Sequence, residues 1–182
     1  MSLSEKKKQE LFDFYSENGF QQSTEQIVKK LNICHKTFFN RYGNKANSIE
    51  IAWSHWQDLC KEKWQNILEN CNHSIEELTM TMYQIYQSRL EAPYYYKYTR
   101  DYRKYLDNNS VFYQFIYSAL EKGKKCFHIQ ENLDLEAYTP FLLNNLFLFG
   151  NEQEPSPQVM RFILYPALTE RGLDLFFETP FA

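Results

Sequence analysis

Residues 19–45 hold the pattern that most restricts how this 182-residue chain can fold. Ser23 and Gln26 form a capping box, in which each side chain bonds the other residue's backbone N–H, so a helix should begin after Ser23. The apolar pair 27–28 follows, and Asn32 tolerates the left-handed conformation that commonly ends a helix. The pattern therefore predicts one short helix that closes near Asn32.

A second short helix is expected from about His35 to Tyr42. Phe38 and Tyr42 lie four residues apart, so they fall on one helix face and can anchor the helix in a core. The other positions are polar, and a polar second helix after a tight turn is typical of a helix-turn-helix motif. A solvated surface helix with ordinary charges would show the same pattern.

The region resembles the DNA-binding domain of the TetR family of transcriptional regulators. In that family a glycine-aromatic pair, here Gly19 and Phe20, precedes the motif, and the recognition helix reads roughly S-K-x-T-[LF]-Y-x-x-F followed by x-x-K. Residues 34–45 of this chain read CHKTFFNRYGNK. The resemblance covers about the first fifty residues, and the remainder agrees in helical layout only.

The resemblance implies that the second helix binds double-stranded DNA. Lys36, Thr37 and Asn40 would face the major groove, where lysine can donate to guanine and asparagine to adenine. Arg41 and Lys45 would contact phosphate. The predicted DNA-binding residues are His35, Lys36, Thr37, Phe39, Asn40, Arg41 and Lys45.

Three positions depart from the family's pattern. Cys34 replaces a serine that would cap the recognition helix better. Lys36 stands where a small residue is common, and Phe39 stands where a tyrosine gives its hydroxyl to phosphate. A segment one residue shorter than usual also precedes Ile27. An alternative therefore stays open, namely a helical ligand-binding or interaction protein whose head no longer binds DNA.

The next segment predicts one unusually long helix. Asn44 can cap it, and apolar residues recur every three or four positions on one side while polar residues occupy the other. A helix of about 27 residues would be roughly 40 Å long. The apolar side comprises Ile49, Trp53, Trp56, Cys60, Trp64, Ile67 and Cys71, and the polar side Glu50, Ser54, Gln57, Lys61 and Gln65.

The rest of the chain also predicts helices, because only five Gly and six Pro interrupt it and no alternating pattern demands a strand. Expected starts are a capping box at Ser74 and Glu77, Pro93, and Asn109 or Ser110. Two apolar segments, 132–149 and 157–178, flank a loop, and Pro166 should kink the second. We expect an all-α fold of about nine helices: a three-helix helix-turn-helix head (1–46) joined by the long helix to a C-terminal bundle (47–182).

Aromatic residues make up 18% of the chain and concentrate between Trp53 and Phe115. A tyrosine stripe is expected on the helix after Pro93, at Tyr94, Tyr98, Tyr102 and Tyr105. The resemblance implies a small-molecule effector in a cavity of the middle helices, and an aromatic wall would favour a flat or hydrophobic ligand. An aromatic stripe at helical spacing is nevertheless part of an ordinary core more often than of a pocket. The residues proposed to line the cavity are Trp64, Tyr86, Tyr102 and Phe115.

The resemblance also implies a homodimer, in which the C-terminal helices pair with their copies; burial inside one chain is the alternative. A dimer would read the two half-sites of a pseudo-palindromic operator. Residues 1–45 hold eight Lys and Arg against five Asp and Glu, a net charge of +3, and residues 46–182 hold twelve against eighteen, a net charge of −6. A basic head on an acidic body suits a protein that presents one end to phosphate.

Other classes of function find little support in the sequence. The four histidines are scattered, and no catalytic or phosphate-cradling motif is present, so we expect no enzyme and no cofactor. Glu69 and His73 fit a surface ion pair at a helix end. The four cysteines lack metal-ligand or redox spacing, which predicts free thiols and no metal. No leader and no membrane-spanning run is apparent, so a cytoplasmic protein without a membrane partner is expected.

Overall fold

The structure, a computed structural model, describes residues 3–149 and 157–179. Over these residues it is all-α, as expected, with ten α-helices, two short 3-10 helices and one isolated β-bridge between Ile129 and Leu168. The count exceeds the expected nine because a short 3-10 helix divides the segment 157–178 in two. The loop predicted between the last two apolar segments lies almost entirely outside the described residues.

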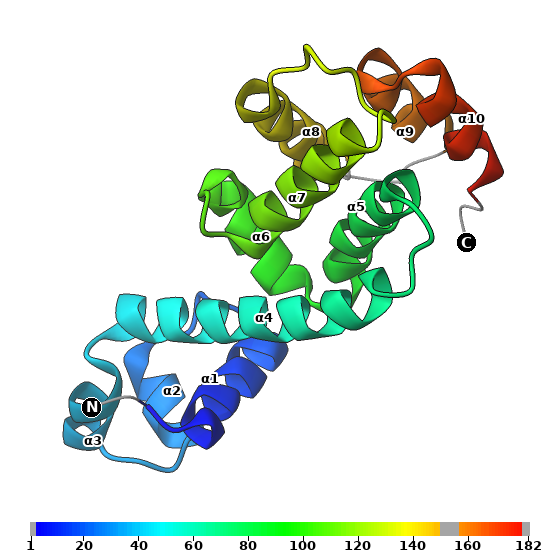
Figure 1. The fold of residues 1–182 in the computed structure, drawn as a ribbon. Coiled ribbons are helices and arrows are strands. Elements are labelled where there is room, and N and C mark those ends of the chain that lie inside the picture. Colours follow the sequence, from blue (N-terminus) through cyan, green and yellow to red (C-terminus); the bar gives the residue numbers. More distant parts are fainter. Residues whose placement is uncertain (1–2, 150–156, 180–182) are drawn as a thin grey trace.

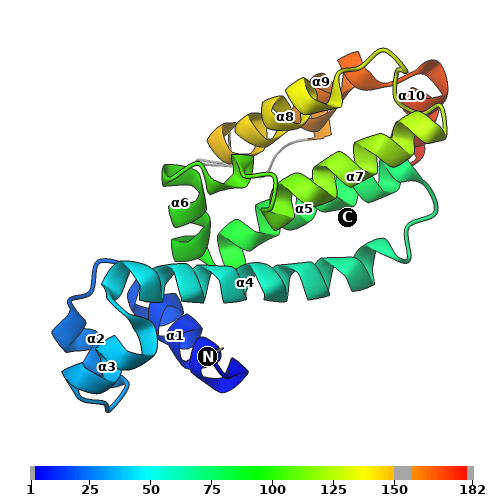
Figure 2. The same ribbon diagram turned by 60° about the vertical axis from the view of Figure 1, so that its left-hand side comes forward.

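Three helices form a small N-terminal unit, which we call the head, and α5 to α10 form a larger unit, the body (Figure 1). The long helix α4 lies between the two units, with the head on one side and the body on the other, as two views of the ribbon show (Figures 1 and 2). The helices are α1 (Glu5–Asn18), α2 (Thr24–Lys30), α3 (His35–Tyr42), α4 (Lys45–Leu68), α5 (Ser74–Glu91), α6 (Pro93–Asp101), η1 (Lys104–Leu106), α7 (Val111–Lys125), α8 (Leu135–Phe149), α9 (Pro157–Leu164), η2 (Tyr165–Ala167) and α10 (Glu170–Glu178).

The head folds as its local signals predict. The Ser23 amide donates to Oε1 of Gln26 at 2.7 Å, and the Gln26 amide donates to Oγ of Ser23 at 3.3 Å, so the predicted capping box is present. Asn32 adopts the predicted left-handed conformation, with φ at 51°. On α1, Phe14 is buried, and Phe12 is partly buried and packs its ring 5.1 Å from that of Tyr95 on α6.

Helix α4 links the two units. Asn44 caps it by accepting a hydrogen bond from the Asn47 amide at 2.8 Å, as predicted. The helix has 24 residues, about 36 Å, and ends at Leu68, before the expected Cys71, because the following amides bond three residues back. Helix α1 packs along its first half, and α5 and α7 contact it further along.

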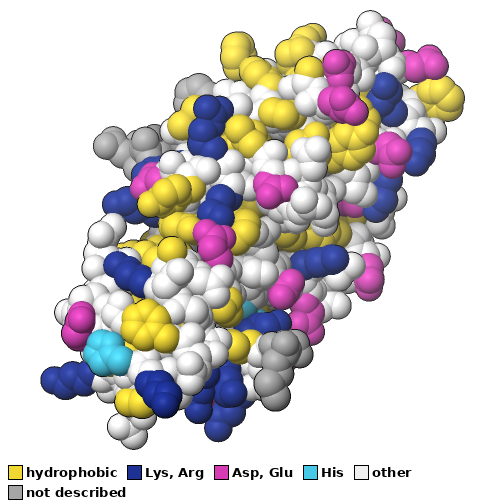
Figure 3. All heavy atoms as spheres, turned by 90° about the vertical axis from the view of Figure 1, so that its left-hand side faces the viewer, with side chains coloured by type: hydrophobic (Ala, Val, Ile, Leu, Met, Phe, Trp, Pro, Cys, Tyr) yellow, Lys and Arg dark blue, Asp and Glu magenta, His cyan; other side chains and the backbone are white. Residues whose placement is uncertain are grey.

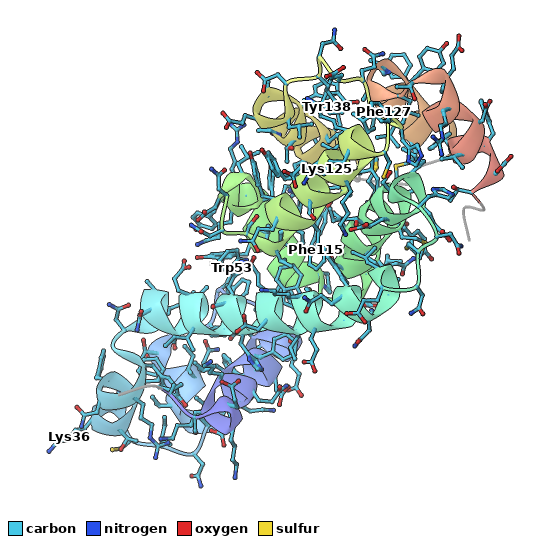
Figure 4. The ribbon with its side chains drawn as sticks, in the orientation of Figure 1. Lys36, Trp53, Phe115, Lys125, Phe127 and Tyr138 are labelled. Carbon is cyan, nitrogen blue, oxygen red and sulfur yellow. The ribbon has the colours of Figure 1, made fainter. Side chains whose placement is uncertain are left out.

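The outer side of α4 is less solvated than its polar pattern suggested. Glu50 accepts a hydrogen bond from Lys104 at 2.7 Å, and Gln57 accepts one from the Val111 amide at 2.8 Å. Trp53 donates to Oγ1 of Thr99 at 2.8 Å, and Figure 4 shows its side chain rising from α4 towards the body. The hydrogen bonds of Glu50, Trp53 and Gln57 therefore attach η1, α6 and α7 to α4.

Two expectations for the body were wrong. The cap of α5 is His73, whose Nδ1 accepts from the Glu76 amide at 3.1 Å, while Ser74 is buried and bonded to His128. The tyrosine stripe also ends early, because α6 stops at Asp101 and the left-handed Arg103 turns the chain into η1. Leu90, near the end of α5, is 59% exposed.

Backbone contacts attach α10 to the turn between α7 and α8. The amide of Gln130 donates to the Ala167 carbonyl at 2.9 Å, and the amide of Thr169 donates to the His128 carbonyl at 3.1 Å. Gly172 lies so close to the backbone of His128 that a Cβ added at residue 172 would sit 2.0 Å from the His128 carbonyl oxygen. Pro166 lies in η2, where the expected kink falls.

Candidate nucleic-acid interface

Helix α3 is held in the head by the two predicted anchors. Phe38 and Tyr42 are 0% and 1% exposed, and their ring centroids lie 5.4 Å apart. Cys34, at the N-cap position, makes no capping bond to the backbone. Its thiol instead lies 3.2 Å from Oγ1 of Thr37, and the hydrogen bond to that hydroxyl lowers the pKa of the thiol.

The opposite face of α3 is turned to solvent. His35, Lys36, Asn40 and Arg41 are exposed, and Thr37 is half-buried. Figure 4 shows Lys36 pointing away from the rest of the molecule at the tip of the head. The polar side of the helix is therefore available to a partner, which is the arrangement that groove entry requires.

Two further predicted residues flank this polar face. Phe39 is 50% exposed although its ring lies 5.7 Å from that of Phe38. Lys45 is half-buried and is the first residue of α4. Its carbonyl accepts a hydrogen bond from Oγ of Ser48 at 2.7 Å, and the same Oγ lies 2.7 Å from the hydroxyl of buried Tyr15. This chain of hydroxyls fixes the start of α4 relative to α1.

Positive charge collects on this end of the molecule. Lys36, Arg41 and Lys45 form no ion pair with an acidic residue in the described part of the chain. In Figure 3, Lys and Arg side chains gather over the lower end, where the head lies, while hydrophobic side chains are more frequent over the body. Unpaired cations near an exposed helix are suited to a phosphate backbone.

The four residues proposed for an effector occupy different surroundings. Trp64 is 1% exposed, and its ring centroid lies 5.6 Å from those of Phe112 and Phe115, so Trp64 and Phe115 are together in the body. Figure 4 shows Phe115 between α7 and α4. Tyr86 is half-buried on α5. Tyr102 is 68% exposed and lies at the junction of head and body.

The C-terminal helices of the body expose several large apolar side chains, which we call together the exposed apolar face. Five large hydrophobic side chains of α8, η2, α9 and α10 are between 47% and 83% exposed. An apolar surface of this kind commonly marks a contact with another protein. These residues are Phe141, Leu148, Phe162, Tyr165 and Phe177.

No three His, Cys, Asp or Glu side chains of the described residues are grouped so that they could hold a metal ion, and the four cysteines are free. Ser74 and His128 form a buried pair at 2.8 Å. Within the described chain, every helix is too short or too polar to cross a membrane.

Comparison with known proteins gives one informative likeness. No model of a protein family matches the chain, and no curated protein matches it by sequence. The fold is similar to that of the ketosteroid transcriptional regulator KstR2 of Mycobacterium tuberculosis, with a TM-score of 0.62 and 12% sequence identity. The alignment covers 92% of this chain and 98% of the regulator. Head, long helix and body are therefore together similar in fold to that protein.

Proposed function

We propose that the protein is a TetR-like transcriptional regulator that binds a pseudo-palindromic operator as a homodimer. One observation carries this proposal: α3 is anchored by Phe38 and Tyr42 and turns its polar side to solvent. The likeness of the whole fold to a transcriptional regulator supports it, as does the resemblance of residues 34–45 to a recognition helix.

Each residue of this interface has a distinct proposed role. Lys36, Thr37 and Asn40 read base edges in the major groove. Arg41 and Lys45 bind phosphate, which fixes how the head lies on the duplex. His35 and Phe39 border the contact. Residues 1–46 would act as the DNA-binding domain, and residues 47–182 would serve dimerisation and effector binding.

The exposed apolar face of α8 to α10 is the proposed dimer contact. Pairing two copies through this face removes the apolar side chains from water and leaves both heads free. A twofold pair is also what a palindromic operator requires. An effector that binds the body differently in the two states would shift the separation of the heads and so lower operator affinity.

The proposal is tested by selecting bound DNA from a random-sequence pool. A regulator should yield a pseudo-palindrome whose half-sites are one helical turn apart, with binding that weakens steeply as salt rises. Lys36→Ala should change which sequences are selected. Lys45→Ala should instead weaken binding to all sequences about equally.

Two results would count against the assignment. Both variants binding like the parent would mean that α3 is not the recognition helix. An absence of any retained DNA at low salt would favour the alternative, a helical ligand-binding or interaction protein whose head does not bind DNA.

A further inference from the structure

A hollow of about 580 Å³ lies where the head meets the body. Its walls come from the turn after α1, the start of α4, and α6. Figures 1 and 2 both place α6 beside the N-terminal half of α4. The side chains that matter for binding are Phe20, Lys45, Tyr94, Lys97, Tyr98 and Tyr102.

Aromatic rings form one side of this hollow. The ring centroids of Phe20 and Tyr98 lie 5.0 Å apart, and those of Tyr98 and Tyr102 lie 4.6 Å apart. Tyr94 and Tyr102 remain 43% and 68% exposed. The three rings of Phe20, Tyr98 and Tyr102 thus lie in succession from the interior of the junction to the surface, where a flat molecule can stack on the exposed ring.

The hollow also carries uncompensated positive charge. The ammonium groups of Lys45 and Lys97 make no hydrogen bond or ion pair within the described residues. Asp101, the only acid among the described residues of the wall, accepts two hydrogen bonds from Arg100, at 2.9 and 3.1 Å. The carboxylate of Glu50 accepts hydrogen bonds from the Lys104 ammonium and the Tyr98 hydroxyl, so its charge is already paired.

We propose that this hollow binds a small aromatic carboxylate. The flat ring would stack on Tyr102 and Tyr94, and the carboxylate would lie between Lys45 and Lys97. A cationic ligand would meet two lysines of like charge, and a saturated anion would leave the tyrosine faces uncovered. The occupant must therefore combine a ring with a negative charge.

One consequence of this site rests on the proposed function. Lys45 is also the residue proposed to hold a DNA phosphate, so a carboxylate bound to it would compete with the operator for the same ammonium group. The ligand would then weaken DNA binding directly at the junction, without any change in the body. Binding of the ligand itself does not depend on DNA.

The site is tested by calorimetric titration of the full chain, without DNA, at low ionic strength. The probes are 2-naphthoate and, as a neutral analogue with the same rings, 2-naphthalenemethanol. Naphthoate should bind about tenfold more tightly than the alcohol. Lys97→Met keeps the apolar stem and should weaken naphthoate binding about three- to tenfold, and Tyr102→Ala should weaken it about threefold.

A matched control is Lys61→Met, which removes an exposed lysine from the same helix α4 away from the hollow, and it should bind naphthoate like the parent. Equal binding of the acid and the alcohol would overturn the proposal. So would an unchanged affinity in Lys97→Met, because the ligand would then lie elsewhere, or no binding at all. Since no DNA is present, these outcomes do not touch the regulator proposal.

Discussion

The hydroxyl pair that joins α1 to α4 makes a sharp prediction about stability. Tyr15 and Ser48 are both 0% exposed, and their oxygens lie 2.7 Å apart. The single hydroxyl proton of Ser48 is given to the Lys45 carbonyl at 2.7 Å, so Tyr15 must donate to Ser48. Burial raises the pKa of Tyr15, and its hydroxyl keeps that proton at neutral pH.

The direction of donation decides which variant loses more stability. Ser48→Ala leaves the tyrosine hydroxyl buried without an acceptor, and an unsatisfied buried donor costs about 1–3 kcal/mol, so we expect a loss of about 2 kcal/mol in unfolding free energy. Tyr15→Phe leaves Ser48 still bonded to the Lys45 carbonyl and should cost about 1 kcal/mol. The double variant has no orphaned group and should also lose about 1 kcal/mol.

The measurement is urea unfolding followed by circular dichroism, with all four proteins at one concentration so that association does not shift the midpoints. The expected ranking places Ser48→Ala as least stable, below the double variant. An additive double variant would refute the reasoning, because the two hydroxyls would then act independently. Equal losses from the two single variants would show that the donation runs differently or that water reaches the pair.

Three other predictions concern the recognition helix, the dimer and pH. Phe39→Tyr should raise DNA affinity about threefold in fluorescence anisotropy. The reason is that it adds a hydroxyl to an exposed ring, at a position where the resembled family contacts phosphate. An unchanged affinity would mean that residue 39 does not contact the DNA backbone. Phe162 is 83% exposed on α9, and Phe162→Glu should give a monomer in sedimentation equilibrium. The control variant Leu90→Glu changes an exposed apolar residue of α5, outside the proposed contact, and should stay dimeric. A monomeric parent protein would contradict the proposed contact. Burial, aided by the positive charge of Arg171 and by His73, lowers the pKa of His128 below 6.5. As the pH falls, His128 therefore takes up a proton in the unfolded chain before it does so in the folded protein, and the unfolding free energy should decline from about pH 6.5 down to the folded pKa and then level off. In urea titrations at several pH values, His128→Asn should lack this decline. An unchanged pH dependence in that variant would exclude His128 as its source.

The elements that sequence reasoning placed well are those defined by neighbouring residues. The capping box at Ser23, the left-handed Asn32 and the cap at Asn44 each depend on contacts within a few positions. The outward face of α3 follows in the same way, because Phe38 and Tyr42 fix which side is buried. Local spacing was therefore sufficient to predict which side of α3 is exposed.

The misplaced elements depend on partners far away in the chain. Ser74 looked like a cap but is bonded to His128, 54 residues later, which leaves His73 to cap α5. Tyr105 was expected on one stripe with its neighbours, yet its ring stacks on Phe147 at 4.3 Å and the helix ends before it. Neither contact leaves a periodic trace in the sequence.

Ligand surfaces are the hardest part to predict, for the same reason. The stripe that contains Trp64 has identical spacing whether it lines a cavity or a packed core, and here Trp64 is packed among aromatic rings. The hollow at the junction joins Phe20, Lys45 and Lys97, which only the assembled fold brings near one another. Lys97 carried no sequence signal beyond its charge, and Lys45 was predicted only as a phosphate contact.

The close approach of Gly172 to the His128 carbonyl has a consequence for how such chains diverge. The attachment of α10 uses main-chain atoms of residues 128, 130, 167 and 169, and the side chains of Gln130 and Thr169 add hydrogen bonds to the carbonyls of Leu168 and Phe127. A change at either side chain removes one bond and leaves the main-chain bonds in place. Residue 172 is more restricted, since even alanine would collide with a backbone oxygen. Among natural variants of this protein, position 172 should thus stay glycine even where its neighbours differ.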